Sequence, residues 1–304
     1  MRDTYRKRIY LHVGLLGLFA ALFIIGTFLD EPVAAAVYAP DVLPAVIVTT
    51  LGLYPFFASQ VMFAGVLTQK AVTSQKPMWC KLIMIAVLVG LSVYSGIKGS
   101  GSLVSIDCLG GMFESLRGSR LVTAGIFLTA ICPLYYVGYR LGKKTCDRQL
   151  VKKMIMILLI MLAAVIIMDK LKSAFSRPRY RIVVRQLEGI GFVPWYKPFS
   201  GAGELRKTYG LTGSDFRSFP SGHSIMSVSC VYIFYSLSWV EEKLRDRQLT
   251  LCIAGALFGM IVMFTRMLLG AHYLSDVSAG AMIATVLSLI FTLLENKLSK
   301  EVSP

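Results

Sequence analysis

Long apolar segments with few or no charges recur along this chain, and they limit the folds that it can adopt. Most are close to the ~20 residues that an α-helix needs to cross a bilayer. The segments are Ile9–Leu29, Leu43–Thr68, Leu82–Ile97, Leu121–Leu141, Met154–Lys170, Ser224–Val240, Leu249–Leu269 and Val277–Leu294. In hydrocarbon, a helix satisfies its backbone polar groups within one segment. The sequence therefore predicts an all-α fold, a polytopic transmembrane helical bundle of about eight spans.

Composition favours the same fold over a soluble helical core. Hydrophobic residues make up 55% of the 304 residues. Charged residues make up only 16%, against about 25% in an ordinary soluble domain. A soluble domain of this size would not need so many nearly uncharged runs. The glycine-rich, half-apolar segment 99–120 is expected at the surface or as a re-entrant piece.

The formal net charge of +15 would suggest nucleic acid as a partner of a soluble chain. Here the basic residues cluster between the apolar runs, so the bilayer and its anionic headgroups are the expected partners, and nucleic acid is not. With a cytoplasmic N-terminus, most lysines and arginines in short loops fall on the inner side, as the positive-inside rule requires. We expect a multi-pass protein of the cell (cytoplasmic) membrane with both termini cytoplasmic and an uncleaved first helix.

One segment departs from that rule. Residues 170–223 contain ten lysines and arginines against three acids, although this topology puts them outside. Either the topology is inverted, or the segment is basic because it binds anions. Both interpretations put the clusters described next on one side of the membrane.

The last cluster contains Arg266, His272 and Asp276, spaced R-x5-H-x3-D. Residues four apart share one face of a helix, so Asp276 can orient His272 and leave the other ring nitrogen free. That arrangement suits a nucleophilic histidine. Arg266 can bind phosphate bidentately. The alternatives are a helix-capping pair and an arginine that anchors to lipid headgroups.

Two further clusters precede it. In the run Pro220-Ser221-Gly222-His223, Gly222 allows close backbone approach, Ser221 adds a hydroxyl donor and His223 can transfer a proton. Upstream, Lys170 and Arg177, followed by Pro178, could both hold phosphate oxygens. The alternatives are a simple cap and turn for the first cluster and snorkelling at a membrane boundary for the second. Three neighbouring arginines are treated as rim charges: Arg179, Arg181 and Arg185.

No metal and no cofactor is expected. The six cysteines show neither C-x-x-C nor C/H metal spacing, and no carboxylate cluster is present that could hold Mg²⁺. We expect structural thiols at Cys80, Cys108, Cys132, Cys146, Cys230 and Cys252.

Taken together, the three clusters resemble the type 2 phosphatidic acid phosphatase superfamily, which includes bacterial lipid phosphatases, glucose-6-phosphatase and vanadium haloperoxidases. Its patterns K-x6-R-P, P-S-G-H and R-x5-H-x3-D are matched at the positions just quoted. One residue departs, because Thr265 stands where the family has serine before the arginine. The resemblance implies a six-helix phosphatase core at 82–294, preceded by a two-helix extension at 1–81 and followed by a cytoplasmic tail at 295–304.

The family mechanism, transferred to this chain, implies a metal-independent phosphoric monoester or diphosphate hydrolase. His272 would form a phosphohistidine with Asp276 orienting it, and His223 would protonate the leaving group and then activate water. The substrate phosphate would be bound by Lys170, Arg177, Ser221, Gly222 and Arg266.

A site at the outer edge of the bilayer suits an amphiphile with its phosphate at headgroup level. Phosphatidic acid, lyso-lipid phosphates and polyprenyl diphosphates such as undecaprenyl diphosphate all qualify, and the sequence does not rank them. A lipid phosphotransferase with the same phosphohistidine, a membrane transporter and a catalytically inactive lipid-binding homologue are the alternatives. The oligomeric state is also left open.

Overall fold

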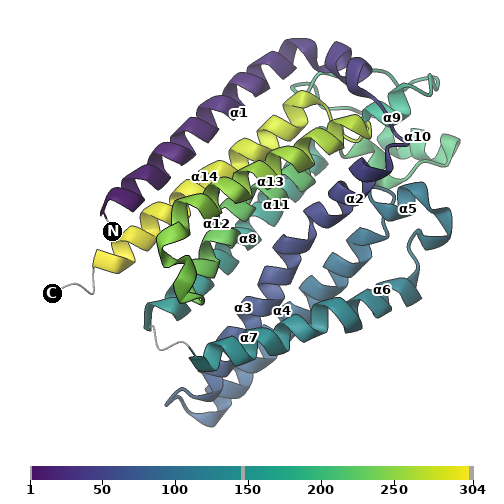
Figure 1. The fold of residues 1–304 in the computed structure, drawn as a ribbon. Coiled ribbons are helices and arrows are strands. Elements are labelled where there is room, and N and C mark those ends of the chain that lie inside the picture. Colours follow the sequence, from purple (N-terminus) through teal and green to yellow (C-terminus); the bar gives the residue numbers. More distant parts are fainter. Residues whose placement is uncertain (1, 145–147, 301–304) are drawn as a thin grey trace.

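The computed structural model describes residues 2–144 and 148–300, and in these residues every regular element is helical. The expected all-α fold is confirmed (Figure 1). Cys146, one of the expected thiols, lies outside the described residues. The long helices are α1 (Arg2–Val37), α3 (Tyr54–Val72), α4 (Met78–Leu103), α7 (Cys132–Lys144), α8 (Arg148–Phe175), α13 (Gln248–Leu268) and α14 (Leu274–Lys300).

Shorter helices connect or extend these. They are α2 (Leu43–Gly52), α5 (Leu109–Met112), η1 (Glu114–Leu116), α6 (Arg120–Ile126), the π-helical η2 (Phe127–Ile131), α9 (Tyr180–Val183), α10 (Ala202–Tyr209), η3 (Gly213–Phe216), α11 (Gly222–Val228), α12 (Cys230–Ser236), η4 (Leu237–Trp239) and η5 (Glu242–Arg247).

Seven stretches of the described chain are long and apolar enough to cross a membrane. They correspond to seven of the predicted spans. The remaining one, Ser224–Val240, is divided at Ser229 into α11 and α12 and ends in η4, so no single helix there is long enough. Large apolar side chains such as Phe28, Leu82 and Leu121 are exposed, as expected where a helix faces lipid.

The helices pack in two neighbouring groups. In one, α1 lies along α14, and α13 packs against α11 and α12. In the other, α3 lies along α4 and α7. Glycines permit the closest approach, because a Cβ at Gly65 or Gly138 would lie within 2.2 Å of a backbone oxygen on the facing helix. Contacts of α13 with α2 join the two groups.

The two ends of the bundle differ. Both chain termini lie at one end, whereas α5, α9 and α10 lie at the other (Figure 1). The second end therefore gathers the non-spanning segments 104–119 and 176–221. Both contribute to the site described next.

Candidate active site

The Pro220–His223 run forms the start of α11. Ser221 is the N-cap residue, and its Oγ accepts a hydrogen bond from the backbone N–H of Ser224 at 3.3 Å. A Cβ on Gly222 would lie 2.5 Å from Sδ of Met168 and 3.5 Å from Cε of Lys172. A side chain there would require the flexible Met168 side chain to shift, so Gly222 lies directly against the Met168 and Lys172 side chains of α8.

The last cluster forms the turn between α13 and α14. Arg266 lies in the last turn of α13, and Gly270 adopts a left-handed φ of 60° that reverses the chain. The backbone N–H of His272 then donates to the carbonyl of Arg266 at 3.2 Å. This turn fixes the imidazole beside the guanidinium that precedes it by six residues.

Asp276 faces the His272 ring. Its Oδ2 lies 3.7 Å from Nδ1 of His272, beyond hydrogen-bond length, so the contact is electrostatic. The same oxygen accepts hydrogen bonds from Oγ of Ser218 at 2.5 Å and from the backbone N–H of Tyr273 at 2.9 Å. Burial holds the pKa of the His272 imidazole well below its usual value, while Asp276 acts in the opposite direction. Burial therefore favours the neutral form of the His272 ring.

The second histidine of the pattern lies in the same region. His223 is buried, its ring is within electrostatic reach of His272, and both rings are within reach of Arg179 and Arg266. Its Nε2 lies 3.6 Å from Sγ of Cys108. The two motif histidines, 49 residues apart in the sequence, thus share one cationic surrounding.

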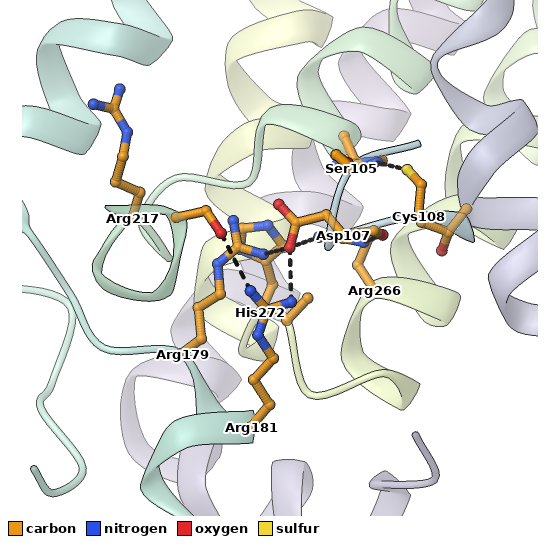
Figure 2. A network of polar contacts seen from close by, with 12 residues as sticks. Ser105, Asp107, Cys108, Arg179, Arg181, Arg217, Arg266 and His272 are labelled. Atoms are coloured by element: carbon orange, nitrogen blue, oxygen red, sulfur yellow. Dashed lines mark hydrogen bonds and ion pairs between the residues drawn. The ribbon is translucent and has the colours of Figure 1, made fainter. Parts of the chain in front are cut away.

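Three arginines surround one carboxylate at this site (Figure 2). Oδ1 of Asp107 lies 2.5 Å from Nη1 of Arg179, 2.7 Å from Nη1 of Arg181 and 3.7 Å from Nη2 of Arg266. Nη1 of Arg266 also donates to the carbonyl of Asp107 at 2.7 Å. Burial alone would raise the pKa of Asp107, but the three guanidinium groups hold it well below its usual value. The carboxylate is therefore an anion bound by an arginine cluster.

A cavity of about 380 Å³ opens on the other side of Asp107. Its charged lining includes Asp41, Asp107, Arg117, Arg181, Asp215 and Arg266. Neither motif histidine is part of this lining. Asp107 and Arg266 line this cavity and are also within electrostatic reach of His223.

The structure does not bring Lys170 into this cluster. Lys170 is exposed on α8, whereas Lys172 is buried beside Gly222 and donates to the carbonyl of Arg217 at 2.8 Å. Two residues span about 200° around an α-helix, so the two lysines point to nearly opposite sides. Lys172 is the lysine of α8 within electrostatic reach of His272.

Arg177 is buried but points away from the cavity. Its Nη1 donates to Oδ1 of Asp276 at 2.6 Å, and its Nη2 donates to Oδ2 of Asp30 at 2.9 Å. The guanidinium lies 4.0 Å from the ring centre of Tyr273 and is fully enclosed. The structure brings together Ser221, Gly222, His223, Arg266, His272 and Asp276 as the sequence predicts, while Lys170 lies apart and Arg177 lies behind Asp276.

Sequence reasoning missed four residues of this site. Lys172 and Arg179 repeat the K-x6-R spacing two positions further along, and that repeat was a usable signal. Arg179 and Arg181 were interpreted as rim charges but contact Asp107 directly. No pattern in the sequence indicated Asp107. In residues 2–144 and 148–300, no group of three or more His, Cys, Asp or Glu side chains could hold a metal ion.

The fold and site define a class, a helical membrane protein with two histidines in a buried, arginine-rich, anion-binding cluster. The family model described as the PAP2 superfamily matches residues 153–300, which include all three motifs from Lys170 onward. This segment matches the PAP2 superfamily, a phosphatase family, and the resemblance inferred from the motifs is confirmed there. No curated protein and no solved structure matches the chain significantly.

Proposed function

We propose that this protein hydrolyses a lipid phosphate or a polyprenyl diphosphate through a phosphohistidine on His272. One observation supports this most strongly: Arg179, Arg181 and Arg266 converge on a single anion beside two imidazoles. Guanidinium groups are the side chains best suited to bind phosphate oxygens, and a converging set stabilises the charge of a phosphoryl transition state.

The contacts of Asp107 support a proposed position for the substrate phosphate. Its carboxylate already sits among the three guanidinium groups, with an oxygen 2.5 Å and 2.7 Å from two of them. The substrate phosphate takes this position and displaces the carboxylate toward the adjoining cavity. A dianionic phosphate competes well, because it presents more charge and more oxygens than one carboxylate.

His272 is the nucleophile in this scheme. Its Nδ1 faces Asp276, so Nε2 is the nitrogen free to attack phosphorus. The N–P bond forms as the bond from phosphorus to the leaving oxygen breaks. Asp276 stabilises the positive charge that develops on the ring, in the way a carboxylate supports a catalytic histidine elsewhere.

His223 supplies the proton. It protonates the leaving oxygen in the first step, then takes a proton from the water that cleaves the phosphohistidine. Its Nε2 faces the thiol of Cys108, the residue next to Asp107. The same short segment therefore covers both the arginine cluster and the proton donor, and it moves aside when substrate binds.

The phosphate ligands differ from the motif assignment. We propose Lys172 and Arg179, in place of Lys170 and Arg177, together with Arg266. The backbone N–H of Gly222 and the hydroxyl of Ser221 complete the set. Ser221 accepts a hydrogen bond from Ser224 through its oxygen, so its own proton remains available to a phosphate oxygen.

The position of the site supports a lipid substrate approached from the outer side. The cluster lies at the end of the bundle opposite both termini, which the distribution of basic residues assigns to the cytoplasm (Figure 1). A phosphate at headgroup level can reach that end while its acyl or prenyl chains stay in the bilayer. We therefore propose a cell-membrane enzyme with cytoplasmic termini and an outward-facing site.

The test is phosphate release by the purified protein from a panel containing phosphatidate, a lyso-lipid phosphate and a polyprenyl diphosphate. The wild type should release inorganic phosphate from at least one of them, and His272→Gln should not. His12→Gln is the matched control, because His12 lies on α1 and bonds Oγ of Ser288 at 2.7 Å, away from the motif residues. Transfer of phosphate to an acceptor lipid without release would favour a phosphotransferase.

A further inference from the structure

Helix α1 lies outside the segment matched by the family model, yet it contacts the start of α14 closely. A Cβ at Gly26 would lie 2.5 Å from the backbone nitrogen of Ser275, so the helix approaches to a distance that only glycine allows. One turn further along α1, Oδ1 of Asp30 accepts the backbone N–H of Ser275 at 2.8 Å. Oδ2 of Asp30 accepts the Ser275 hydroxyl.

Asp30 thus caps a helix that it does not belong to. The first backbone N–H groups of a helix have no partner within it, and a carboxylate is a favourable acceptor for them. Here the acceptor comes from another helix, 245 residues earlier in the chain. The contact fixes α1 against the turn that holds His272 and Asp276.

Arg177 links the two carboxylates. Its Nη2 lies 2.9 Å from Asp30 and its Nη1 lies 2.6 Å from Asp276. Its Nε donates to the carbonyl of Val193 at 2.7 Å. The side chains of all three linked residues are at most 2% exposed, and the Arg177 guanidinium is occupied by Asp30, Asp276 and the carbonyl of Val193. They form a buried row that ends at His272.

The charges of this row explain why a second carboxylate is needed. Arg177 alone would neutralise Asp276 and remove the negative charge that faces His272. With Asp30 present, two carboxylates share one guanidinium, and one net negative charge remains. That charge acts across the 3.7 Å between Asp276 and Nδ1 of His272.

We infer that Asp30 is a positioning residue for the nucleophile, acting on His272 through Arg177 and Asp276, and that the N-terminal helix is thereby part of the active site. This inference rests on the proposed function. It gives α1 a role in the reaction although α1 has none of the family motifs.

The test compares three variants for kcat, KM and the pH dependence of kcat/KM on whichever lipid phosphate the wild type hydrolyses. Asp30→Asn removes one negative charge, so the imidazolium of His272 is less stabilised. Its kcat should fall by roughly tenfold to a hundredfold with little change in KM, the scale of losing a buried partner of a catalytic group. The acid limb of its kcat/KM profile should move to lower pH.

Two other variants separate charge from structure. Arg177→Gln removes the positive charge and should move the acid limb to higher pH. The double variant Asp30→Asn with Arg177→Gln removes one charge of each sign and should bring the limb back toward the wild-type position. Such compensation is the signature of coupled residues. The other groups that interact with His272 stay unchanged in all three variants: Lys172, Arg179, His223, Arg266 and Asp276.

Glu31→Gln is the control, because Glu31 is the exposed neighbour of Asp30 on the same helix. It should leave kcat and the pH profile unchanged. An Asp30→Asn enzyme with wild-type kcat and profile would overturn the inference, as would acid limbs that shift in the same direction in both single variants. If Asp30→Asn does not fold, the Arg177→Gln and double-variant profiles decide the question. A wild type that hydrolyses no lipid phosphate would instead refute the proposed function.

Discussion

Two buried arginine networks lie at the same end of the bundle, and they are built with opposite stoichiometry. Behind His272, one guanidinium is shared by two carboxylates, those of Asp30 and Asp276. In front of it, one carboxylate is shared by three guanidinium groups, those of Arg179, Arg181 and Arg266. Asp215 takes part of the charge of Arg181, at 2.7 Å, and the front network still keeps an excess of positive charge.

The difference indicates how one site handles two tasks. The acid-rich network is sealed, and it faces the imidazole that becomes a cation in the proposed scheme. The base-rich network borders a cavity, and its excess charge is the part that a phosphate can satisfy. Charged groups in membrane helices are costly, so an unequal charge ratio points to a ligand more strongly than a matched ion pair does.

Among changes to the network around Asp107, Arg266→Gln is expected to cause the largest loss of activity. This arginine is fully buried and contacts Asp107 through both its carboxylate and its carbonyl. Loss of a donor to the transition-state charge typically costs about a hundredfold to a thousandfold in kcat. Steady-state phosphate release measures it. Arg217→Gln, which removes an exposed arginine paired with Asp169, is the control and should stay close to wild type.

A comparison of two lysines tests which of them binds phosphate. Lys172→Gln should lower kcat/KM by about a hundredfold, because the buried ammonium lies within electrostatic reach of His272. Lys170→Gln should change it by about twofold or less, as expected of an exposed charge. The reverse order would restore the motif assignment of Lys170 and remove Lys172 from the site. The measurement is kcat/KM of both variants on one lipid phosphate. Expression level and elution volume in gel filtration check that each variant is folded.

Asp107→Asn should strengthen anion binding, because the carboxylate that competes for the arginines is lost. We expect vanadate, a mimic of the pentacoordinate transition state, to inhibit about tenfold more strongly, a change of about 1.4 kcal/mol. Asp41→Asn, in the lining of the same cavity, is the control. Weaker inhibition of Asp107→Asn would mean that Asp107 organises the arginines and does not occupy the phosphate position.

The smallest effect concerns pH. In the proposed scheme His272 must be unprotonated to attack. Burial lowers the pKa of its imidazole, so the neutral ring persists to more acid pH than in water. The acid limb of kcat/KM, which reports the free enzyme, should therefore lie below pH ~6.5, the usual histidine value. A limb above that value would mean that the ring is stabilised as a cation in the free enzyme.

The sequence predicted the helical class and most of the motif cluster, because both depend on local patterns. Apolar runs mark the spans, and the R-x5-H-x3-D and P-S-G-H patterns each lie within one short segment of the chain. It did not predict the break at Ser229 between α11 and α12, which both pack against α13.

Contacts between segments far apart in the chain could not be predicted from the sequence. Asp107 and Asp30 have no local signal, since each meets its partners across more than 70 residues. The sequence also could not show which of Lys170 and Lys172 points toward the motif residues. That depends on which face of α8 packs against Gly222, and Lys172 lies on that face. The K-x6-R spacing fits both lysines and does not say which of them points toward the motif residues.

The most direct test of the account is to stop the reaction of the purified enzyme in denaturant at early times and to locate the phosphoryl group by mass spectrometry. The account predicts an acid-labile phosphate on His272 that forms in the wild type and in His12→Gln and is absent from His272→Gln. Phosphate release without any such adduct, or with the phosphate on another residue, would contradict it.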